Sequence, residues 1–228
     1  MHRVQCSLDS DAGVWKAVLN DLNAVPVFAL ADAAGRILQQ RETADGQKLV
    51  IFYAEVDRAL DELAAARESS GDYDLVLKPT GLGMAYAQVQ EGGALLVPGF
   101  RELGAAQDMQ LAAPADAAAM LASAGIDNPT AKWGNDVLPI FGCFEMVRRR
   151  KDGTTFTPLF MSHVDAQAAF EKARRANSER AANFEVDVVP LPELLDLAAA
   201  GTLKVPPRVI PPTDSMLYLQ DKYVRQQE

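Results

Sequence analysis

The sequence is poor in the residues that build disulfides, metal sites and many catalytic centres. Its 228 residues include two cysteines, Cys6 and Cys143, and two histidines. Neither cysteine has a second Cys or His at ligand spacing, so neither a disulfide framework nor a zinc site is predicted, and the redox compartment stays open. We therefore expect no bound metal and no cofactor.

Long apolar runs are also absent from the sequence. No run approaches the roughly 18 apolar residues that a membrane-spanning helix needs. The N-terminal stretch MHRVQCSLDSD lacks the apolar core of a signal peptide. We expect peripheral membrane association at most, and we expect any targeting segment to lie outside this chain.

Positive charge is scarce relative to negative charge. Lys and Arg number 22 against 31 Asp and Glu, which gives a formal net charge of −9. Such a surface repels nucleic-acid phosphates and anionic lipid headgroups, so no nucleic-acid partner is expected. The apolar fraction of 49% is ordinary for a globular protein. The length suffices for one large domain or two small ones.

Motifs of several known active sites are missing as well. The hydrolase elbow G-x-S-x-G, the metalloprotease motif H-E-x-x-H and the EF-hand loop do not occur. The stretch GLGMAY, residues 81–86, follows a strand pattern and opens a helix. It lacks the third glycine of a dinucleotide loop, so a plain strand-to-helix turn is favoured over a phosphate cradle. We therefore expect no catalytic residue and no enzymatic activity.

A few polar residues admit both a chemical and a structural interpretation. For His163, the pattern SHVD favours a helix start, with Ser162 as N-cap and Asp165 completing a capping box, over catalysis. For Asp57 and Asp165, stabilisation of a helix N-terminus is favoured over acid–base chemistry. The basic run RRRK, residues 148–151, is interpreted as a solvated hairpin turn rather than a docking spot.

Hydrophobic periodicity predicts that strands and helices alternate along the chain. Strands are expected at residues 25–30, 48–55, 73–79, 94–98, 137–147, 156–162, 184–190 and 208–212. A first helix of about 14 residues, capped by Asp9 or Ser10, is expected through Leu22. Further helices are expected at residues 55–68, 80–93, 105–125, 163–180, 191–201 and 214–224, with a break at Pro114 and with Thr80 as a candidate cap. Residues 126–136 are the best linker candidate. Pro26 and Pro139 each predict a strand at a sheet edge, or one that pairs on one side only at the proline.

The two halves of the chain echo one another. Val25 and Leu138 open the similar phrases VPVF and LPIF, which lie 113 positions apart. Further anchors follow in the same order: Phe52 with Phe160, Asp57 with Asp165, Pro79 with Pro190, and Leu96 with Val209. Loops absorb length changes more readily than strands, so this pattern indicates a duplicated unit. We predict an α/β (α+β) fold with two pseudo-symmetric halves, each a small mixed or antiparallel sheet packed by helices. The expected boundaries are an N-terminal helix at 1–24 and halves at 25–130 and 131–228, which form one compact unit.

Several phrases, taken together, resemble a known family. They are VPVF, the strand endings FY and LFMS, VDRAL and VDAQAAF, GLGMAY, and VIPPTDSMLYLQ. Over residues 13–224 the chain resembles the Tic-twenty-two family, the soluble intermembrane-space component of the chloroplast inner-envelope translocon and its cyanobacterial and apicoplast relatives. Residues 99–135 carry no phrase of that family. The resemblance implies a symmetric two-half fold and a non-enzymatic role in a plastid.

The function implied by the resemblance is chaperone-like binding of unfolded precursor proteins between the envelope membranes, with translocon subunits as further partners. Alternatives are a structural or assembly subunit of a large plastid complex, a cyanobacterial-type factor in outer-membrane biogenesis, and an enzyme with an unrecognised site. The candidate apolar positions for a client or partner are Phe28, Phe52, Phe141 and Phe160. Each either packs a core or lines a groove, and core packing is favoured because large apolar strand residues are usually buried.

Overall fold

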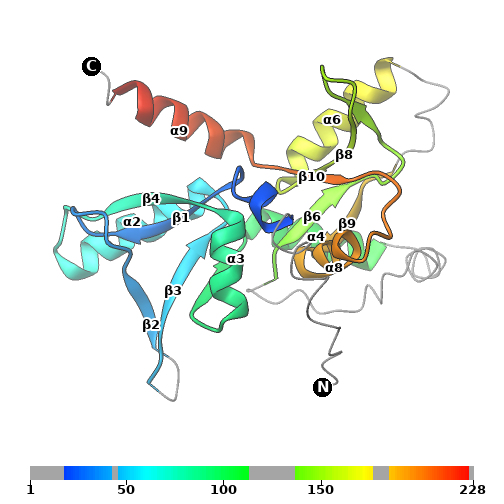
Figure 1. Cartoon of the computed structure of the whole chain (residues 1–228). Helices are drawn as coiled ribbons and strands as arrows, with labels where there is room; N and C mark the ends of the chain where they lie inside the picture. The colour runs from blue at the N-terminus through cyan, green and yellow to red at the C-terminus, as the bar shows by residue number, and fades with distance from the viewer. Residues whose placement is uncertain (1–17, 43–45, 113–136, 177–184, 226–228) are drawn as a thin grey trace.

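The computed structural model describes residues 18–42, 46–112, 137–176 and 185–225 (Figure 1). After a helical segment at 18–22, the first half contains β1 (Pro26–Ala31), β2 (Gln39–Glu42), β3 (Lys48–Tyr53), α2 (Val56–Ser70), β4 (Val76–Gly81), α3 (Leu82–Gln90), β5 (Ala94–Val97) and α4 (Phe100–Ala112). The second half contains β6 (Pro139–Gly142), β7 (Arg148–Arg149), β8 (Thr155–Phe160), α6 (His163–Ala176), β9 (Asp187–Pro190), α8 (Leu191–Ala199), β10 (Pro207–Ile210) and α9 (Thr213–Arg225). The expected break at Pro114 and the expected linker at 126–136 lie outside the described residues.

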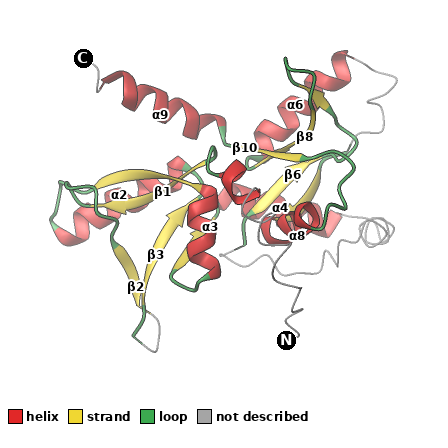
Figure 2. Cartoon of the chain, viewed as in Figure 1, coloured by secondary structure: helices red, strands yellow, loops and turns green. Residues whose placement is uncertain are grey.

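The two sheets have the same topology. In the first, β3 pairs antiparallel with β1 and β2 and parallel with β5, and β1 also pairs antiparallel with β4. In the second, β8 pairs antiparallel with β6 and β7 and parallel with β10, and β6 also pairs antiparallel with β9. Figure 2 shows these two sheets in yellow with helices around them. The mixed α/β class is confirmed, whereas descent of the halves from one duplicated unit stays a prediction.

Strand register corrects one of the expected anchor pairs. The backbone N–H of Leu82 donates to the Val25 carbonyl (2.8 Å), and the N–H of Leu191 donates to the Leu138 carbonyl (2.9 Å). Leu191 is therefore the counterpart of Leu82, and Pro190 is the counterpart of Gly81 rather than of Pro79. The sequence match of two prolines was coincidental, because the register depends on hydrogen bonds with a distant strand.

A second anchor pair was wrong by one residue. Phe28 on β1 lies opposite Tyr53, and the matching Phe141 on β6 lies opposite Phe160, so Tyr53 and Phe160 are the equivalent positions. Successive strand side chains point to opposite faces of a sheet. Phe52 accordingly packs in the core between the two halves, and Phe160 packs in the outer core of the second half.

Neither proline-bearing strand lies at a sheet edge, so that expectation was wrong. The strand β1 lies between β3 and β4, and β6 lies between β8 and β9. The alternative, pairing on one side only at the proline, is confirmed in the recorded register. Pro26 pairs with Gly81 of β4, and Pro139 pairs with Pro190 of β9, whereas pairing with the other neighbour begins at Phe28 and Phe141. The missing N–H of each proline is thus tolerated inside the sheet, because β3 and β8 end opposite Phe28 and Phe141, before they reach the prolines.

Three apolar cores hold the fold together. The central core takes residues from both halves, including Val27, Phe52 and Leu82 from the first and Ile140 and Leu194 from the second. One outer core lies between the first sheet and α2, and the other lies between the second sheet and α6. Burying apolar side chains is the main favourable term in folding, so the shared central core couples the stability of the two halves.

The last helix of each half packs on the other half. Helix α9 returns across the molecule, as Figure 1 shows in red, and contacts α2 of the first half. The Tyr218 ring of α9 meets the Phe28 ring edge-on, with 5.8 Å between centroids. In the same way α4 contacts β6 and β9 of the second half, where Ala106 packs in one core with Phe141. This exchange of helices places the N-termini of α4 and α9 at the junction between the halves.

Candidate functional site

All four candidate phenylalanines are buried. Phe28, Phe52 and Phe141 have no exposed surface, and Phe160 is 8% exposed. They are divided among the three cores. In this structure they offer no surface to a partner, and any contact surface must be built from other residues.

The GLGMAY stretch is a site of close packing. A Cβ atom on Gly81 would lie 2.7 Å from the Asn23 Oδ1 atom, and one on Gly83 would overlap the carbonyl oxygen of Leu19. The two glycines therefore let the helical segment 18–22 approach the start of α3. Thr80 is not the cap, because the Asn23 Oδ1 atom accepts from the Met84 N–H (2.8 Å). The favoured interpretation as a strand-to-helix turn describes this geometry.

Of the capping box predicted for the SHVD stretch, the Ser162 N-cap is confirmed and the role of Asp165 is not. The Ser162 hydroxyl accepts from the Asp165 N–H (3.4 Å), as an N-cap does. Asp165 does not complete a capping box, because its carboxylate accepts instead from the N–H (2.8 Å) and hydroxyl (2.9 Å) of Thr213. His163 packs its ring against Phe141 (5.1 Å between centroids). Asp165 thus stabilises the N-terminus of α9, which sequence spacing could not indicate.

The basic run RRRK covers β7 (Arg148–Arg149) and the first residues of the turn to β8, so half of it is strand rather than the expected turn. Residues 148–151 are exposed, and Gly153 takes a positive φ of 88° in the turn, as the Asp-Gly pair predicts. The guanidinium of Arg150 lies over the Phe156 ring (5.3 Å). Nothing in the structure tests a docking role for this run.

Cys143 is a buried, unreactive thiol. Burial, followed by the hydrogen bond from its Sγ atom to the Glu145 carboxylate (3.0 Å), raises the pKa of Cys143 to about 12. Reactive cysteines have lowered pKa values, so Cys143 is not a nucleophile at neutral pH. Cys6 lies outside the described residues. Among the described residues, no three or more His, Cys, Asp or Glu side chains are placed to hold a metal ion.

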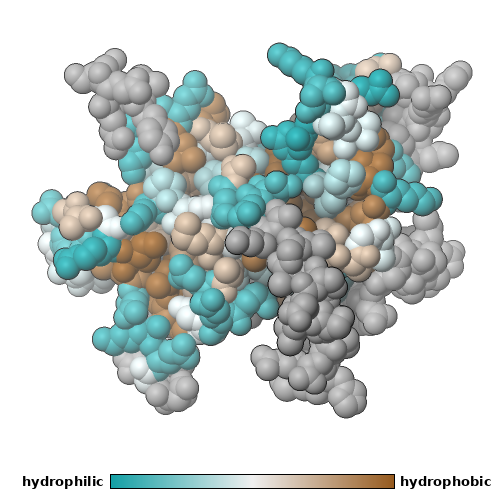
Figure 3. All heavy atoms as spheres, viewed as in Figure 1, coloured by the Kyte–Doolittle hydropathy of each residue, from teal (hydrophilic) through white to brown (hydrophobic). Residues whose placement is uncertain are grey.

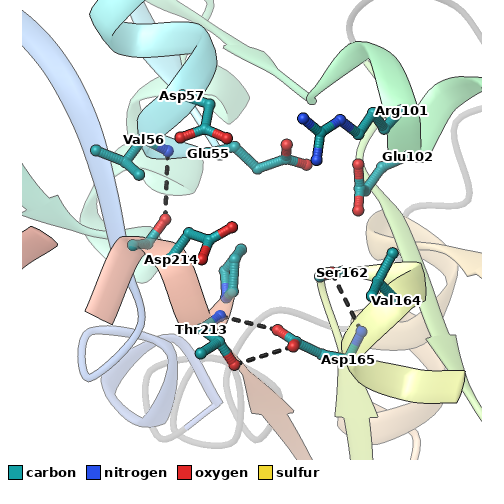
Figure 4. Close-up of a pocket in the computed structure, with 12 residues that line it drawn as sticks. Glu55, Val56, Asp57, Arg101, Glu102, Ser162, Val164, Asp165, Thr213 and Asp214 are labelled. Carbon is teal, nitrogen blue, oxygen red and sulfur yellow. Dashed lines mark hydrogen bonds between the residues drawn. The ribbon is translucent and has the colours of Figure 1, made fainter. Parts of the chain in front are cut away.

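A cavity of about 210 Å³ lies where the N-termini of α2, α4, α6 and α9 meet (Figure 4). We call it the junction cavity. Its lining comes from residues 55–57, 101–102, 162, 164–165 and 212–215. Both halves and both exchanged helices contribute, so the cavity exists only in the assembled fold.

Side chains at the junction cavity cap helices across the boundary between the halves. The Glu102 carboxylate of α4 accepts from the His163 N–H at the start of α6 (3.3 Å). The Ser215 hydroxyl of α9 accepts from the Val56 N–H at the start of α2 (3.3 Å). Each helix start carries backbone N–H groups that lack a partner within the helix. These two bonds satisfy such groups and tie each half to the helix that it receives.

The junction cavity holds two facing carboxyl groups at its inner end. Glu102 is 4% exposed, and its carboxylate shares a side-chain hydrogen bond with the Glu55 carboxyl. The Glu55 carboxyl faces it from the start of α2. Burial, and then the Glu102 carboxylate beside it, raise the pKa of Glu55 to about 8, against a smaller lowering by the Gly99 backbone. Glu55 therefore carries its proton at neutral pH.

The titration of Glu55 predicts a pH-dependent stability. Folded Glu55 holds its proton up to about pH 8, whereas its reference pKa is 4.5, so raising the pH between these values lowers the free energy of unfolding. Replacing Glu55 with glutamine removes this effect. We expect Glu55→Gln to match the wild type near pH 5 and to exceed it by on the order of 1–2 kcal/mol at pH 9 in urea unfolding. The control is Asp61→Asn, on the exposed side of α2. An equal difference at both pH values would contradict the assignment.

A second, more open hollow lies beside α9. It has a volume of about 230 Å³ and is lined by the segment before β1, the end of β4 and one side of α9. Pro26, Pro79, Met216 and Leu219 supply apolar surface. Met216 is 45% exposed and its neighbour Leu217 is 57% exposed. We call this hollow the α9 groove. Figure 3 shows, more generally, that brown apolar patches occur on the visible face of the first half.

The β4 strand next to the α9 groove is protected against strand addition over part of its length. The bond between Leu82 and Val25 sets the register, so the backbone groups of Leu77, Pro79 and Gly81 point away from β1. The Lys222 ammonium of α9 donates to the Leu77 carbonyl (2.9 Å). Pro79 has no N–H to offer. The Pro79 carbonyl and the Gly81 N–H still point outward, whereas the Gly81 carbonyl belongs to the N-cap of α3 and accepts its first helical hydrogen bond.

Of the residues that line the junction cavity, Asp57, Ser162 and Asp165 were considered from the sequence, whereas the facing pair Glu55 and Glu102 was not. Glu55 and Glu102 lie 47 positions apart, and neither belongs to a motif. Glu55 lies two positions after the end of β3, and Glu102 lies five positions after the end of β5, at the start of α4. An acidic residue near a helix start is common for electrostatic reasons alone. No described helix is long and apolar enough to cross a membrane.

No protein-family model and no curated protein matches this sequence. Solved structures with the same fold include two Tic22 proteins. Tic22 from Plasmodium falciparum is similar over 91% of this chain and 98% of its own, with a TM-score of 0.68 and 15% identity. Tic22 from Anabaena, a protein described as acting in protein transport, is similar over 94% of this chain and 98% of its own, with a TM-score of 0.60 and 16% identity. The chain therefore has the Tic22 fold.

Proposed function

We propose that this chain is a member of the Tic22 family and acts, without enzymatic activity, in protein import at the plastid envelope. The observation that carries the proposal is the shared fold, which extends over 91% of this chain and 98% of the Plasmodium protein. The description of the Anabaena protein supports a transport role. Because one fold can serve several functions, the proposal also needs a surface suited to the task.

The surface that we assign to this task is the α9 groove, and its proposed occupant is an extended apolar segment of an unfolded precursor. Pro26, Pro79, Met216 and Leu219 offer apolar contacts. The Pro79 carbonyl and the Gly81 N–H, which point away from β1, offer hydrogen-bonding groups to an extended chain. Methionine suits a surface that accepts varied sequences, because its side chain is flexible and polarizable.

The proposal assigns no catalytic role to the junction cavity, because its polar groups have structural roles. Converging ionisable groups in a cavity are also a feature of enzymes. Here the hydroxyl of Ser215 and the carboxylates of Glu102 and Asp165 accept hydrogen bonds from helix N-termini. A structural explanation therefore accounts for the groups that a catalytic mechanism would use.

Site-specific photocrosslinking tests the client site. A photoreactive phenylalanine at Met216 is expected to crosslink to a urea-diluted plastid precursor, and the same group at Tyr73 is not. Tyr73 is a suitable control because it is 73% exposed and does not line the groove. The folded mature form of that precursor should give no adduct. One stoichiometric adduct in a plastid extract, independent of added precursor, would instead support the structural-subunit alternative.

A further inference from the structure

Positive charge gathers on one hairpin of a chain whose net charge is −9. The four cations of the run RRRK, residues 148–151, follow one another along β7 and into the turn to β8, and all four are exposed. Asp152 is the one carboxylate within residues 148–156. Its Oδ1 atom accepts from the N–H (2.9 Å) and the hydroxyl (2.6 Å) of Thr154. Figure 1 shows that the hairpin leading into β8 projects from the second half, so its cations are open to a partner.

The fold adds a fifth cation from a distant part of the sequence. The strand β7 pairs with β8 at Phe156, and β10 pairs with β8 from Thr157 onward, which brings the exposed Arg208 of β10 to the same stretch of β8. The guanidinium of Arg150 lies 5.3 Å from the centre of the Phe156 ring, and that of Arg208 lies 5.5 Å from it. Among the described residues, none of the five cations forms an ion pair with a carboxylate. We call residues 148–151 together with Phe156 and Arg208 the basic hairpin.

We propose that the basic hairpin binds an extended acidic segment, rich in Asp and Glu, of a partner polypeptide. This surface is separate from the α9 groove, and the proposal does not depend on the transport role. A guanidinium offers its N–H donors in a planar fork that matches the two oxygens of a carboxylate. Arginine side chains that stack on an aromatic ring are partly held in place before binding, which lowers the entropy lost on binding. Phe156, which is half-buried, is therefore a positioning residue for Arg150 and Arg208.

The backbone of β7 favours a polypeptide as this occupant. Among the strands of the described residues, β7 pairs with β8 alone. The Arg150 N–H donates to the Thr154 carbonyl (2.8 Å). Because backbone direction alternates along an antiparallel strand, the N–H and carbonyl of Arg149 point away from β8. An extended segment can pair with these groups by strand addition, and this pairing places its alternate carboxylates beside Arg148 and Arg150.

An anionic membrane is a poorer match for the basic hairpin. A bilayer is broad and repels the rest of a chain that carries a net charge of −9, whereas a single acidic segment contacts the hairpin alone. The turn residues DGTT, at positions 152–155, bring no apolar side chain that could enter a bilayer. Nucleic acid is disfavoured by the same repulsion.

The test uses two fluorescent peptides of nine residues that differ only in charge. One has glutamate at its four even positions and threonine elsewhere, and the other has glutamine in place of each glutamate. Fluorescence anisotropy with the full chain is expected to show at least about tenfold tighter binding of the glutamate peptide. The net charge of the chain by itself predicts the opposite preference. Equal affinities, or tighter binding of the glutamine peptide, would therefore overturn the proposal.

Variants that each remove one charge locate the binding surface. Arg150→Gln and Arg208→Gln are each expected to lower the glutamate-to-glutamine affinity ratio about threefold, because a single exposed ion pair contributes little. Lys48→Gln, which removes an exposed charge from β3 in the first half, should leave the ratio unchanged. The three side chains are exposed, so folding should be preserved. An equal fall in all three variants would contradict the assignment to the hairpin.

Substitution of Phe156 separates its positioning role from charge. Phe156→Leu keeps every charge and is expected to lower the ratio about twofold, whereas Phe156→Tyr keeps the ring and should retain it. An unchanged ratio in Phe156→Leu would show that the ring does not position the arginines.

Vesicle sedimentation tests the membrane alternative. The full chain is expected to bind vesicles of phosphatidylglycerol and phosphatidylcholine no better than vesicles of phosphatidylcholine alone. Binding that requires the anionic lipid and is lost in Arg150→Gln, together with equal affinities for the two peptides, would overturn the proposal in favour of a membrane contact.

Discussion

Replacing Tyr218 with alanine is expected to destabilise the first half of the molecule by about 2–3 kcal/mol, although Tyr218 belongs to the last helix of the chain. Its ring meets Phe28 edge-on and packs in the outer core of the first half. Removing a large aromatic side chain from a core loses both its apolar burial and its contacts. The expected loss is smaller than for a fully buried ring, because Tyr218 is only partly buried.

Hydrogen exchange locates this effect as well as measuring it. We expect faster exchange in β1, β4 and α2, with a smaller change in β8 and β10. The control is Leu217→Ala, one position away on the same helix, where the side chain is 57% exposed and the expected cost is below about 0.5 kcal/mol. Faster exchange centred on the second sheet would show that α9 does not support the first half as the structure indicates.

A single methyl group at Gly83 is expected to cost about 3 kcal/mol. A Cβ atom there would overlap the backbone carbonyl of Leu19, which cannot move without shifting the helical segment 18–22 away from α3. Forcing extra atoms into a well-packed contact typically costs about 1–3 kcal/mol, and a backbone obstacle puts Gly83→Ala at the upper end.

Gly104 provides the matched control, since it also lies in a helix, α4. A Cβ atom at Gly104 meets no atom within 4 Å. Gly104→Ala is therefore expected to stabilise the chain by about 0.5–1 kcal/mol, because alanine is the better helix former. Urea unfolding of both variants checks the opposite signs. Destabilisation of similar size in both variants would show that the close contact with the Leu19 carbonyl does not explain why glycine is required at position 83.

The local elements were predictable because their signals are local. Periodic apolar residues predicted α2, α6, α8 and α9, and the Asp-Gly pair at Asp152 predicted the turn before β8. The echo of VPVF and LPIF correctly matched the opening strands of two sheets with one topology. Such patterns depend on residues a few positions apart, which a sequence displays directly.

Register was not predictable from the same patterns. The expected match of Phe52 with Phe160 was wrong by one residue, and the two rings pack in different cores as a result. A shift of one position reverses the face of every strand residue. The register follows from hydrogen bonds such as that between Leu82 and Val25, whose partners lie on separate strands.

The sequence by itself determined the class of the fold and the order of most of its elements, although the short strands β2 and β7 were not expected. Only the tertiary structure decided that α4 and α9 are exchanged, and that Glu55 and Glu102 meet in a cavity with a helix start from each half around it. The physical reason is the sequence separation over which each interaction acts. Helix and strand preference act between near neighbours, whereas the exchange and the buried carboxyl pair arise from the packing of apolar faces that no short pattern connects.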